Sequence, residues 1–84
     1  MDKLKYEIVS LKNGKQYFVL ETIFYEYDIY NLCLNVEDEY DIKIFLQEVK
    51  NGKTVLTEVN DKEILKNISS IFEQNLRNKI NSTN

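Results

Sequence analysis

The strand pattern that decides the fold is clearest in residues 30–36, Tyr30-Asn31-Leu32-Cys33-Leu34-Asn35-Val36. Large apolar residues alternate here with smaller or polar ones at a period of two, which is typical of a β-strand with one buried face. The same kind of pattern extends in both directions along the chain. It predicts further strands around residues 4–8, 17–25, 42–47 and 54–59, so the strands together occupy about residues 3–59.

Short turns separate the predicted strands. Lys12-Asn13-Gly14-Lys15 and Lys50-Asn51-Gly52-Lys53 are two copies of one turn sequence, and an Asn-Gly pair between apolar runs is a strong hairpin signal. Residues 26–28 and the acidic residues 37–41 supply the other two connections. Because connections this short cannot carry a parallel crossover, the sequence predicts an antiparallel meander.

The register of both hairpins depends on the length of the Asn-Gly turn, since a slip of one residue moves every side chain to the other face. A two-residue loop would place Leu46 opposite Thr57. We expect three-residue loops, with Gly14 and Gly52 as left-handed bulge residues, because they keep the large apolar residues on one face. The expected partners are Tyr6 with Leu20, Ile8 with Phe18, and Leu46 with Leu56.

A helix is predicted over about residues 61–80, followed by a polar tail, residues 81–84, that we expect to fray. Asn60 is a suitable N-cap and Glu63 follows three residues later, as in a capping box. Glu73 and Arg77 have the spacing of a favourable ion pair. An apolar stripe at helical spacing consists of Ile64, Ile68, Ile71, Phe72, Leu76 and Ile80, with Leu65 beside it.

These elements predict a single domain, residues 1–84, of the α+β class: an antiparallel five-stranded β-meander with one C-terminal α-helix packed on one face. Phe72 is the expected central anchor of the helix, facing Leu20, Leu32 and Leu46.

Several segments of this pattern are shared with a known family. They are Phe18-Val19-Leu20-Glu21-Thr22-Ile23-Phe24, Tyr30-Asn31-Leu32, Gly52, Leu56, Val59, Asp61, Glu63 and Ile71-Phe72. In these segments the chain resembles the YrzB-like family of small uncharacterised bacterial proteins, over nearly its whole length. The resemblance implies the same fold and an intracellular setting, and it brings no reaction, ligand or catalytic residue.

Composition excludes several classes of site. The 84 residues include no His and one Cys, so a disulfide within the chain, a zinc site of Cys and His ligands, and a Ser-His or Cys-His dyad are all ruled out. Cys33 has no nearby base and is expected to be an unreactive apolar residue. We therefore expect no enzyme and no cofactor.

Charge and hydropathy limit the classes of partner that the sequence predicts. The net charge is −3, and residues 21–48 carry eight acidic residues against one basic residue, which is unlike a nucleic-acid binder. No apolar run approaches the ~20 residues of a membrane span, and the N-terminus lacks the apolar stretch of a secretory signal. The expected location is the cytoplasm, without membrane or nucleic acid as a partner.

The acidic loop contains Glu37, Asp38, Glu39 and Asp41. Carboxylates are the ligands that calcium prefers, but this run lacks the alternating ligands, the Gly and the final Glu of a calcium loop. We expect a solvated loop and no metal site.

The sheet face opposite the helix is expected to carry Val9, Tyr17, Val19, Ile23, Tyr25, Cys33, Phe45 and Val55. Monomers rarely expose so much apolar surface. Either the sheet curls to shield this face or a partner covers it. We expect a protein partner or a homodimer, with the contact made by Tyr17, Tyr25, Phe45 and Val55.

The resulting functional hypothesis is a small non-catalytic protein-interaction or regulatory module in the cytoplasm. The alternative is an acidic inhibitor or immunity-type protein that blocks a basic site on a partner protein.

Overall fold

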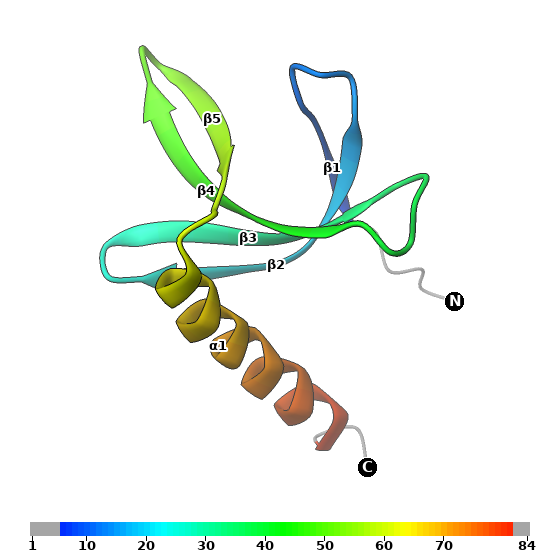
Figure 1. Ribbon diagram of the computed structural model, residues 1–84, viewed down its shortest axis with the longest axis vertical. Coiled ribbons are helices and arrows are strands. Elements are labelled where there is room, and N and C mark those ends of the chain that lie inside the picture. Colours follow the sequence, from blue (N-terminus) through cyan, green and yellow to red (C-terminus); the bar gives the residue numbers. More distant parts are fainter. Residues whose placement is uncertain (1–5, 82–84) are drawn as a thin grey trace.

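The computed structural model describes residues 6–81, which form five strands and one helix (Figure 1). Each strand pairs antiparallel with the next, in the order β1-β2-β3-β4-β5. The predicted α+β meander with a C-terminal helix is thereby confirmed. The elements are β1 (Glu7–Ser10), β2 (Gln16–Tyr25), β3 (Asp28–Asn35), β4 (Ile42–Lys50), β5 (Lys53–Glu58) and α1 (Lys62–Asn81).

The sheet curls into a half-barrel, and each of its faces buries its own apolar cluster. The β1–β2 and β4–β5 hairpins rise on one side of the sheet, while α1 lies on the other side (Figure 1). The helix-side cluster consists of Ile23, Tyr30, Ile44, Ile68 and Phe72. The inner cluster, on the concave face, consists of Tyr17, Cys33 and Phe45. The curl therefore shields much of the face that we expected a partner to cover.

A β-bulge in β2 changes which residues face the helix. Val19 lies opposite Cys33, but the next paired residue is Glu21, opposite Leu32, so that Leu20 is the extra residue. A bulge inserts one residue and reverses the facing of those beyond it. The expectation that Ile23 and Tyr25 lie on the concave face is therefore wrong, because both pack in or against the helix-side cluster.

The first hairpin has the expected three-residue loop. Ile8 lies opposite Phe18, and the backbone N–H of Gly14 donates to the carbonyl of Leu11 at 3.0 Å. The expected pair of Tyr6 with Leu20 does not form, because β1 begins at Glu7. The ring of Tyr6 packs edge-on against Phe18 instead, with centroids 6.5 Å apart.

The second hairpin has the shorter, two-residue loop, so the expected register is wrong there. Leu46 lies opposite Thr57, and Lys50 lies opposite Lys53. Asn51 and Gly52 both have positive φ, 53° and 77°, as a type I′ turn requires. This register lets Leu56, rather than Val55, pack against the inner cluster.

Both turn glycines hold the left-handed conformation that was expected, with φ of 88° at Gly14 and 77° at Gly52. We expect Gly14→Val or Gly52→Val to lower the free energy of unfolding by about 1 kcal/mol or more, because a β-branched side chain is strained at positive φ. Urea unfolding of each variant measures the change. Space around both Cα atoms is open, so an unchanged midpoint would mean that the turn had adopted another backbone conformation.

The helix is capped by Asp61 and not by Asn60, which corrects the expected boundary. The Oδ1 atom of Asp61 accepts hydrogen bonds from the backbone N–H groups of Glu63 and Ile64, at 2.9 and 3.1 Å. Asp has the additional advantage of a negative charge at the positive end of the helix dipole. The predicted Glu73–Arg77 ion pair is present at 3.0 Å.

Only the first part of the apolar stripe on α1 is covered by the sheet. Ile68 and Phe72 are buried, whereas Leu76 and Ile80 are about 60% exposed. Phe72 is the expected anchor. Leu32 and Leu46 pack against its cluster as expected, but Leu20, the bulged residue, is not among them.

Candidate functional site

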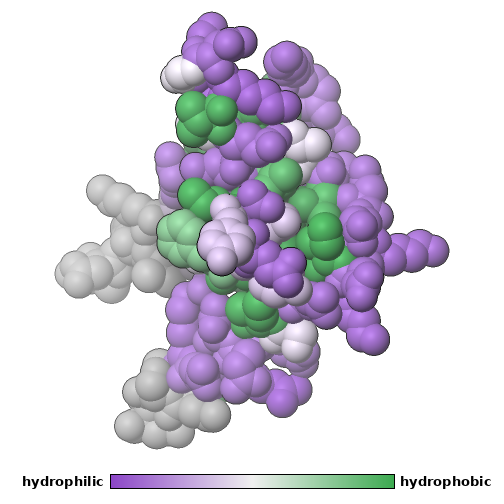
Figure 2. All heavy atoms as spheres, turned by 90° about the vertical axis from the view of Figure 1, so that its left-hand side faces the viewer, coloured by the Kyte–Doolittle hydropathy of each residue, from purple (hydrophilic) through white to green (hydrophobic). Residues whose placement is uncertain are grey.

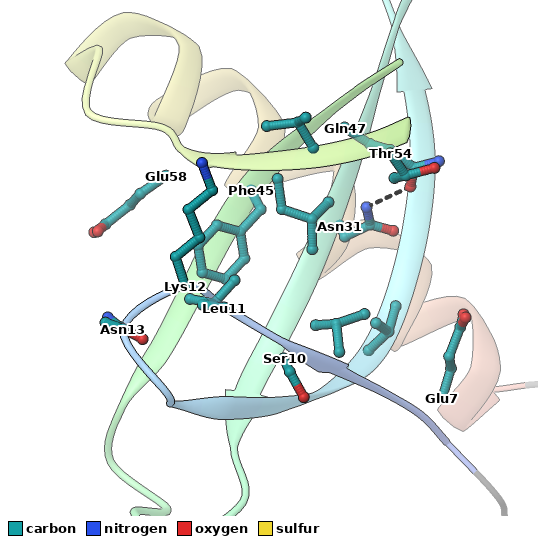
Figure 3. A pocket seen from close by; sticks show the side chains of 14 residues that line it. Glu7, Ser10, Leu11, Lys12, Asn13, Asn31, Phe45, Gln47, Thr54 and Glu58 are labelled. Carbon is teal, nitrogen blue, oxygen red and sulfur yellow. Dashed lines mark hydrogen bonds between the residues drawn. The ribbon is translucent and has the colours of Figure 1, made fainter. Parts of the chain in front are cut away.

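A groove of about 840 Å³ lies on the concave face of the half-barrel, between the two outer hairpins (Figure 3). One wall comes from the β1 side and includes Glu7, Ser10 and Leu11. The other wall comes from β5 and includes Thr54 and Glu58. The groove thus exists because the sheet curls without closing.

Part of the floor of the groove is apolar and closely packed. Phe45 lines the groove although it is 2% exposed, and its ring meets that of Tyr17 in an edge-to-face contact with centroids 5.4 Å apart. Cys33 completes this inner cluster and Val19 packs against it. Buried aromatic pairs of this geometry hold their rings in place, so the floor is formed before any ligand arrives.

Asn31 and Gln47 line the groove beside Phe45, and hydrogen bonds link them to Thr22. The hydroxyl of Thr22 donates to Oδ1 of Asn31 at 2.6 Å, and Nδ2 of Asn31 donates to Oε1 of Gln47 at 2.9 Å (Figure 3). Asn31 is only 3% exposed. Its side-chain oxygen and nitrogen are both engaged, and the Oε1 atom of Gln47 is engaged as an acceptor.

The strands on either side of the groove, β1 and β5, are the two edges of the sheet. Within residues 6–81 neither edge pairs with a further strand. Edge strands carry backbone N–H and C=O groups that can pair with another extended chain. The groove is therefore bordered by hydrogen-bonding backbone on both sides.

Tyr17 has a structural role that the sequence did not indicate. It is fully buried, and its hydroxyl donates to Oδ2 of Asp41 at 2.7 Å. Nδ2 of Asn35 donates to the same oxygen at 3.0 Å, and Nζ of Lys43 lies 3.4 Å from Oδ1. Burial and the hydrogen bond to Asp41 raise the pKa of Tyr17. Tyr17 therefore anchors the β3–β4 loop from below, and its expected place on an exposed partner surface is wrong.

Asp41 makes the fold sensitive to acid. Hydrogen bonds from Tyr17 and Asn35 lower its pKa in the folded protein. Its contribution to stability is thus present above the ordinary carboxyl pKa of about 4 and is lost as the pH falls through the lower, folded-state value. We expect Asp41→Asn to be less stable than the parent protein at neutral pH, with the difference disappearing at low pH. Urea unfolding across this pH range measures it, and a difference independent of pH would contradict the assignment.

Cys33 is fully buried in the inner cluster, and burial raises the pKa of its thiol to about 11. We expect the native protein to react with thiol reagents only as fast as it unfolds, because the thiolate is the reactive form. The reaction rate should rise to that of a free thiol in urea. A fast reaction in the native state would show that the inner cluster opens.

The acidic loop is divided by the structure. Asp41 joins the Tyr17 network, whereas Glu37, Asp38 and Glu39 are exposed. Across residues 6–81, no three or more His, Cys, Asp or Glu side chains converge as metal ligands would.

The four expected contact residues are distributed over three places. Phe45 and Val55 line the groove, and Tyr17 lies beneath it. Tyr25 lies on the helix side, where its hydroxyl accepts a hydrogen bond from Nδ2 of Asn67 at 3.1 Å. The hydrogen bonds of Asn31 were not predicted, although an Asn between Tyr30 and Leu32, inside an apolar strand, was a visible signal.

The side of the molecule drawn in Figure 2 shows no large apolar patch. On the side shown in Figure 2, apolar side chains lie in small groups separated by hydrophilic ones. Among the described residues, no helix combines the length and apolar character needed to cross a membrane. Comparison with protein-family models, with curated proteins and with solved structures found no match to this chain.

Proposed function

We propose that the protein is a small non-catalytic interaction module that binds an extended segment of a partner protein in the groove between β1 and β5. The observation that carries this proposal is a groove with a strand edge on each side that pairs with no further strand among residues 6–81. Its volume of about 840 Å³ falls in the range of ligand-binding clefts.

The chemistry of the groove suits a peptide. An extended segment can add to a sheet edge through its backbone while its side chains enter pockets beside the edge. Phe45 and Leu56 offer apolar contact, and the amide of Gln47 offers a hydrogen bond. A partner segment with apolar residues at alternate positions fits this arrangement.

Two properties of the chain support a non-catalytic role in the cytoplasm. The sequence has no His, and its one thiol is buried with a raised pKa, so the groups most used for acid–base and nucleophilic catalysis are missing or inaccessible. A free Cys without a partner for a disulfide suits a reducing compartment. Assignment to the YrzB-like family stays a prediction on the residues given above.

The groove is tested with two matched variants on the same strand. Thr54 and Thr57 are both exposed on β5, but only Thr54 lines the groove. We expect peptides selected from a random display library to bind the parent protein and Thr57→Trp equally, and to lose at least tenfold in affinity with Thr54→Trp, whose indole fills the groove. Equal binding to all three proteins would show that the peptides bind elsewhere and would contradict the proposal.

A second copy of the chain could also fill the groove, and the protein would then form a homodimer. Light scattering at tens of micromolar protein measures it directly. A dimer that Thr54→Trp dissociates would mean that a second copy, rather than another protein, fills the groove.

The second candidate function is an acidic inhibitor or immunity-type protein that blocks a basic site. The exposed carboxylates of Glu37, Asp38 and Glu39 favour it, because within residues 6–81 none of them belongs to an ion pair.

A further inference from the structure

A second hollow, of about 450 Å³, lies between the sheet and the β3–β4 loop. Phe18 and Leu34 form its apolar part together with Val36. The rest of its lining forms the rim and consists of Asn35, Glu37, Asp38, Glu39 and Tyr40, which is 87% exposed. Its lining shares no residue with the groove, so an inference about the hollow does not depend on the proposed function of the groove.

The loop that forms the rim is held in one conformation by its own hydrogen bonds. Oδ1 of Asn35 accepts from the backbone N–H of Glu37 at 2.8 Å, and Oδ1 of Asp38 accepts from that of Tyr40 at 3.0 Å. The N–H of Asp41 donates to the carbonyl of Asp38 at 3.1 Å. Together with the buried Tyr17–Asp41 contact, these bonds fix the rim in advance, which lowers the entropic cost of binding.

The negative charge of this rim is not neutralised within the described residues. The nearest basic residue in sequence, Lys43, already forms ion pairs with Asp41 and Glu58, each at 3.4 Å. Glu37 and Glu39 lie on either side of Asp38 in an exposed loop. A cation entering the hollow would therefore meet carboxylates that form no ion pair with another described residue.

We propose that this hollow receives an arginine side chain of a partner protein. The two parts of an arginine side chain, its methylene stem and its guanidinium, together match the apolar, acidic and aromatic parts of the hollow. Its methylene stem suits the apolar surface of Phe18 and Leu34, and its guanidinium suits both a carboxylate and the face of an aromatic ring such as Tyr40. A metal ion would leave the apolar part unused.

The sheet surface next to the hollow indicates which residues flank the arginine in the partner segment. One continuous apolar row lies on the sheet face opposite the inner cluster, and it consists of four residues paired across four adjacent strands: Ile8, Phe18, Leu34 and Ile42. Ile8 and Ile42, at its two ends, are 50% and 56% exposed. The hollow includes the middle of this row, so the bound segment carries apolar residues beside its arginine.

The test uses a defined probe, the acetylated and amidated pentapeptide Leu-Arg-Leu-Arg-Leu. Its comparison peptide has citrulline, which keeps the shape of arginine and removes the charge, in place of both arginines. In an NMR titration of the ¹⁵N-labelled protein we expect shift changes at Phe18, Leu34 and residues 36–40. We expect binding of the citrulline peptide to be at least fivefold weaker.

Two double variants separate the specific site from general charge. Glu37→Gln with Glu39→Gln removes two carboxylates of the rim, and we expect it to weaken binding of the arginine peptide about fivefold. Glu26→Gln with Asp28→Asn removes the same charge from the exposed β2–β3 turn, and we expect no more than a small change.

Three results would overturn the proposal. They are equal binding of the two peptides, equal effects of the two double variants, and the absence of shift changes around the hollow at millimolar peptide. Shift changes at Gln47, Thr54 and Leu56 alone would place the peptide in the groove. That outcome would reject the hollow as an arginine site and leave the proposed function of the groove intact.

Discussion

Phe72→Ala is expected to leave the protein largely unfolded at 37 °C. Phe72 is 6% exposed and lies in the cluster that joins α1 to the sheet. Replacing a buried Phe by Ala costs about 3–5 kcal/mol, and the whole stability of a small domain is of order 5–15 kcal/mol. Circular dichroism during heating measures the loss, which should appear as a melt shifted far below that of the parent protein.

Leu76→Ala is the matched control, because Leu76 continues the same apolar stripe one turn further on but is 59% exposed. We expect this variant to melt close to the parent protein. A cooperative melt of Phe72→Ala near the parent temperature would show that the helix is not anchored through this side chain.

Phe45→Glu is expected to unfold the inner half of the molecule rather than merely to alter its surface. The Phe45 side chain is 2% exposed and packs against Tyr17. A carboxylate at this position would be buried without a partner, which costs several kcal/mol. Urea unfolding and the dispersion of amide NMR signals both report the loss.

The control for Phe45→Glu is Phe24→Glu on strand β2, where the side chain is 78% exposed. We expect the free energy of unfolding of this variant to stay within about 0.5 kcal/mol of the parent value, as is usual for surface substitutions. Retention of the native spectrum by Phe45→Glu would mean that the concave face opens readily to water.

The order of elements could be predicted from the sequence because the meander is encoded locally. Each predicted strand has a period-two pattern and each connection is a short polar turn, so nearest-neighbour pairing was the simple outcome. The position of the helix followed from the stripe containing Ile68 and Phe72. Its cap was misplaced by one residue because Asn60 and Asp61 are both good capping residues, and only the backbone geometry chooses between them.

The register could be predicted for one hairpin and not for the other, although both turns read Lys-Asn-Gly-Lys. This sequence is compatible with a two-residue and a three-residue loop, so the strands decide. In the first hairpin the longer loop sets Val9 opposite Tyr17, and in the second the shorter loop sets Leu56 opposite Gln47. Each loop length brings apolar residues of its hairpin to the inner cluster. This cluster could not be inferred from either hairpin alone.

The bulge at Leu20 explains why the sequence placed Ile23 and Tyr25 on the wrong face of the sheet. No Gly marks it, and Val19 and Leu20 read as ordinary strand residues. The extra residue lets one long strand serve both clusters, with Tyr17 on the inner side and Ile23 on the helix side. The groove follows from the resulting curl, which is a tertiary effect and leaves no local signal in the sequence.

The nearest-neighbour strand order has a consequence for how the chain folds. Every strand pair closes a short loop, and closing short loops costs little chain entropy. Proteins with such local contacts fold quickly, so the hairpins can form one after another without waiting for distant segments. The contact of α1 with β2 spans most of the chain, and we expect the docking of this helix to be the slow, final step of folding.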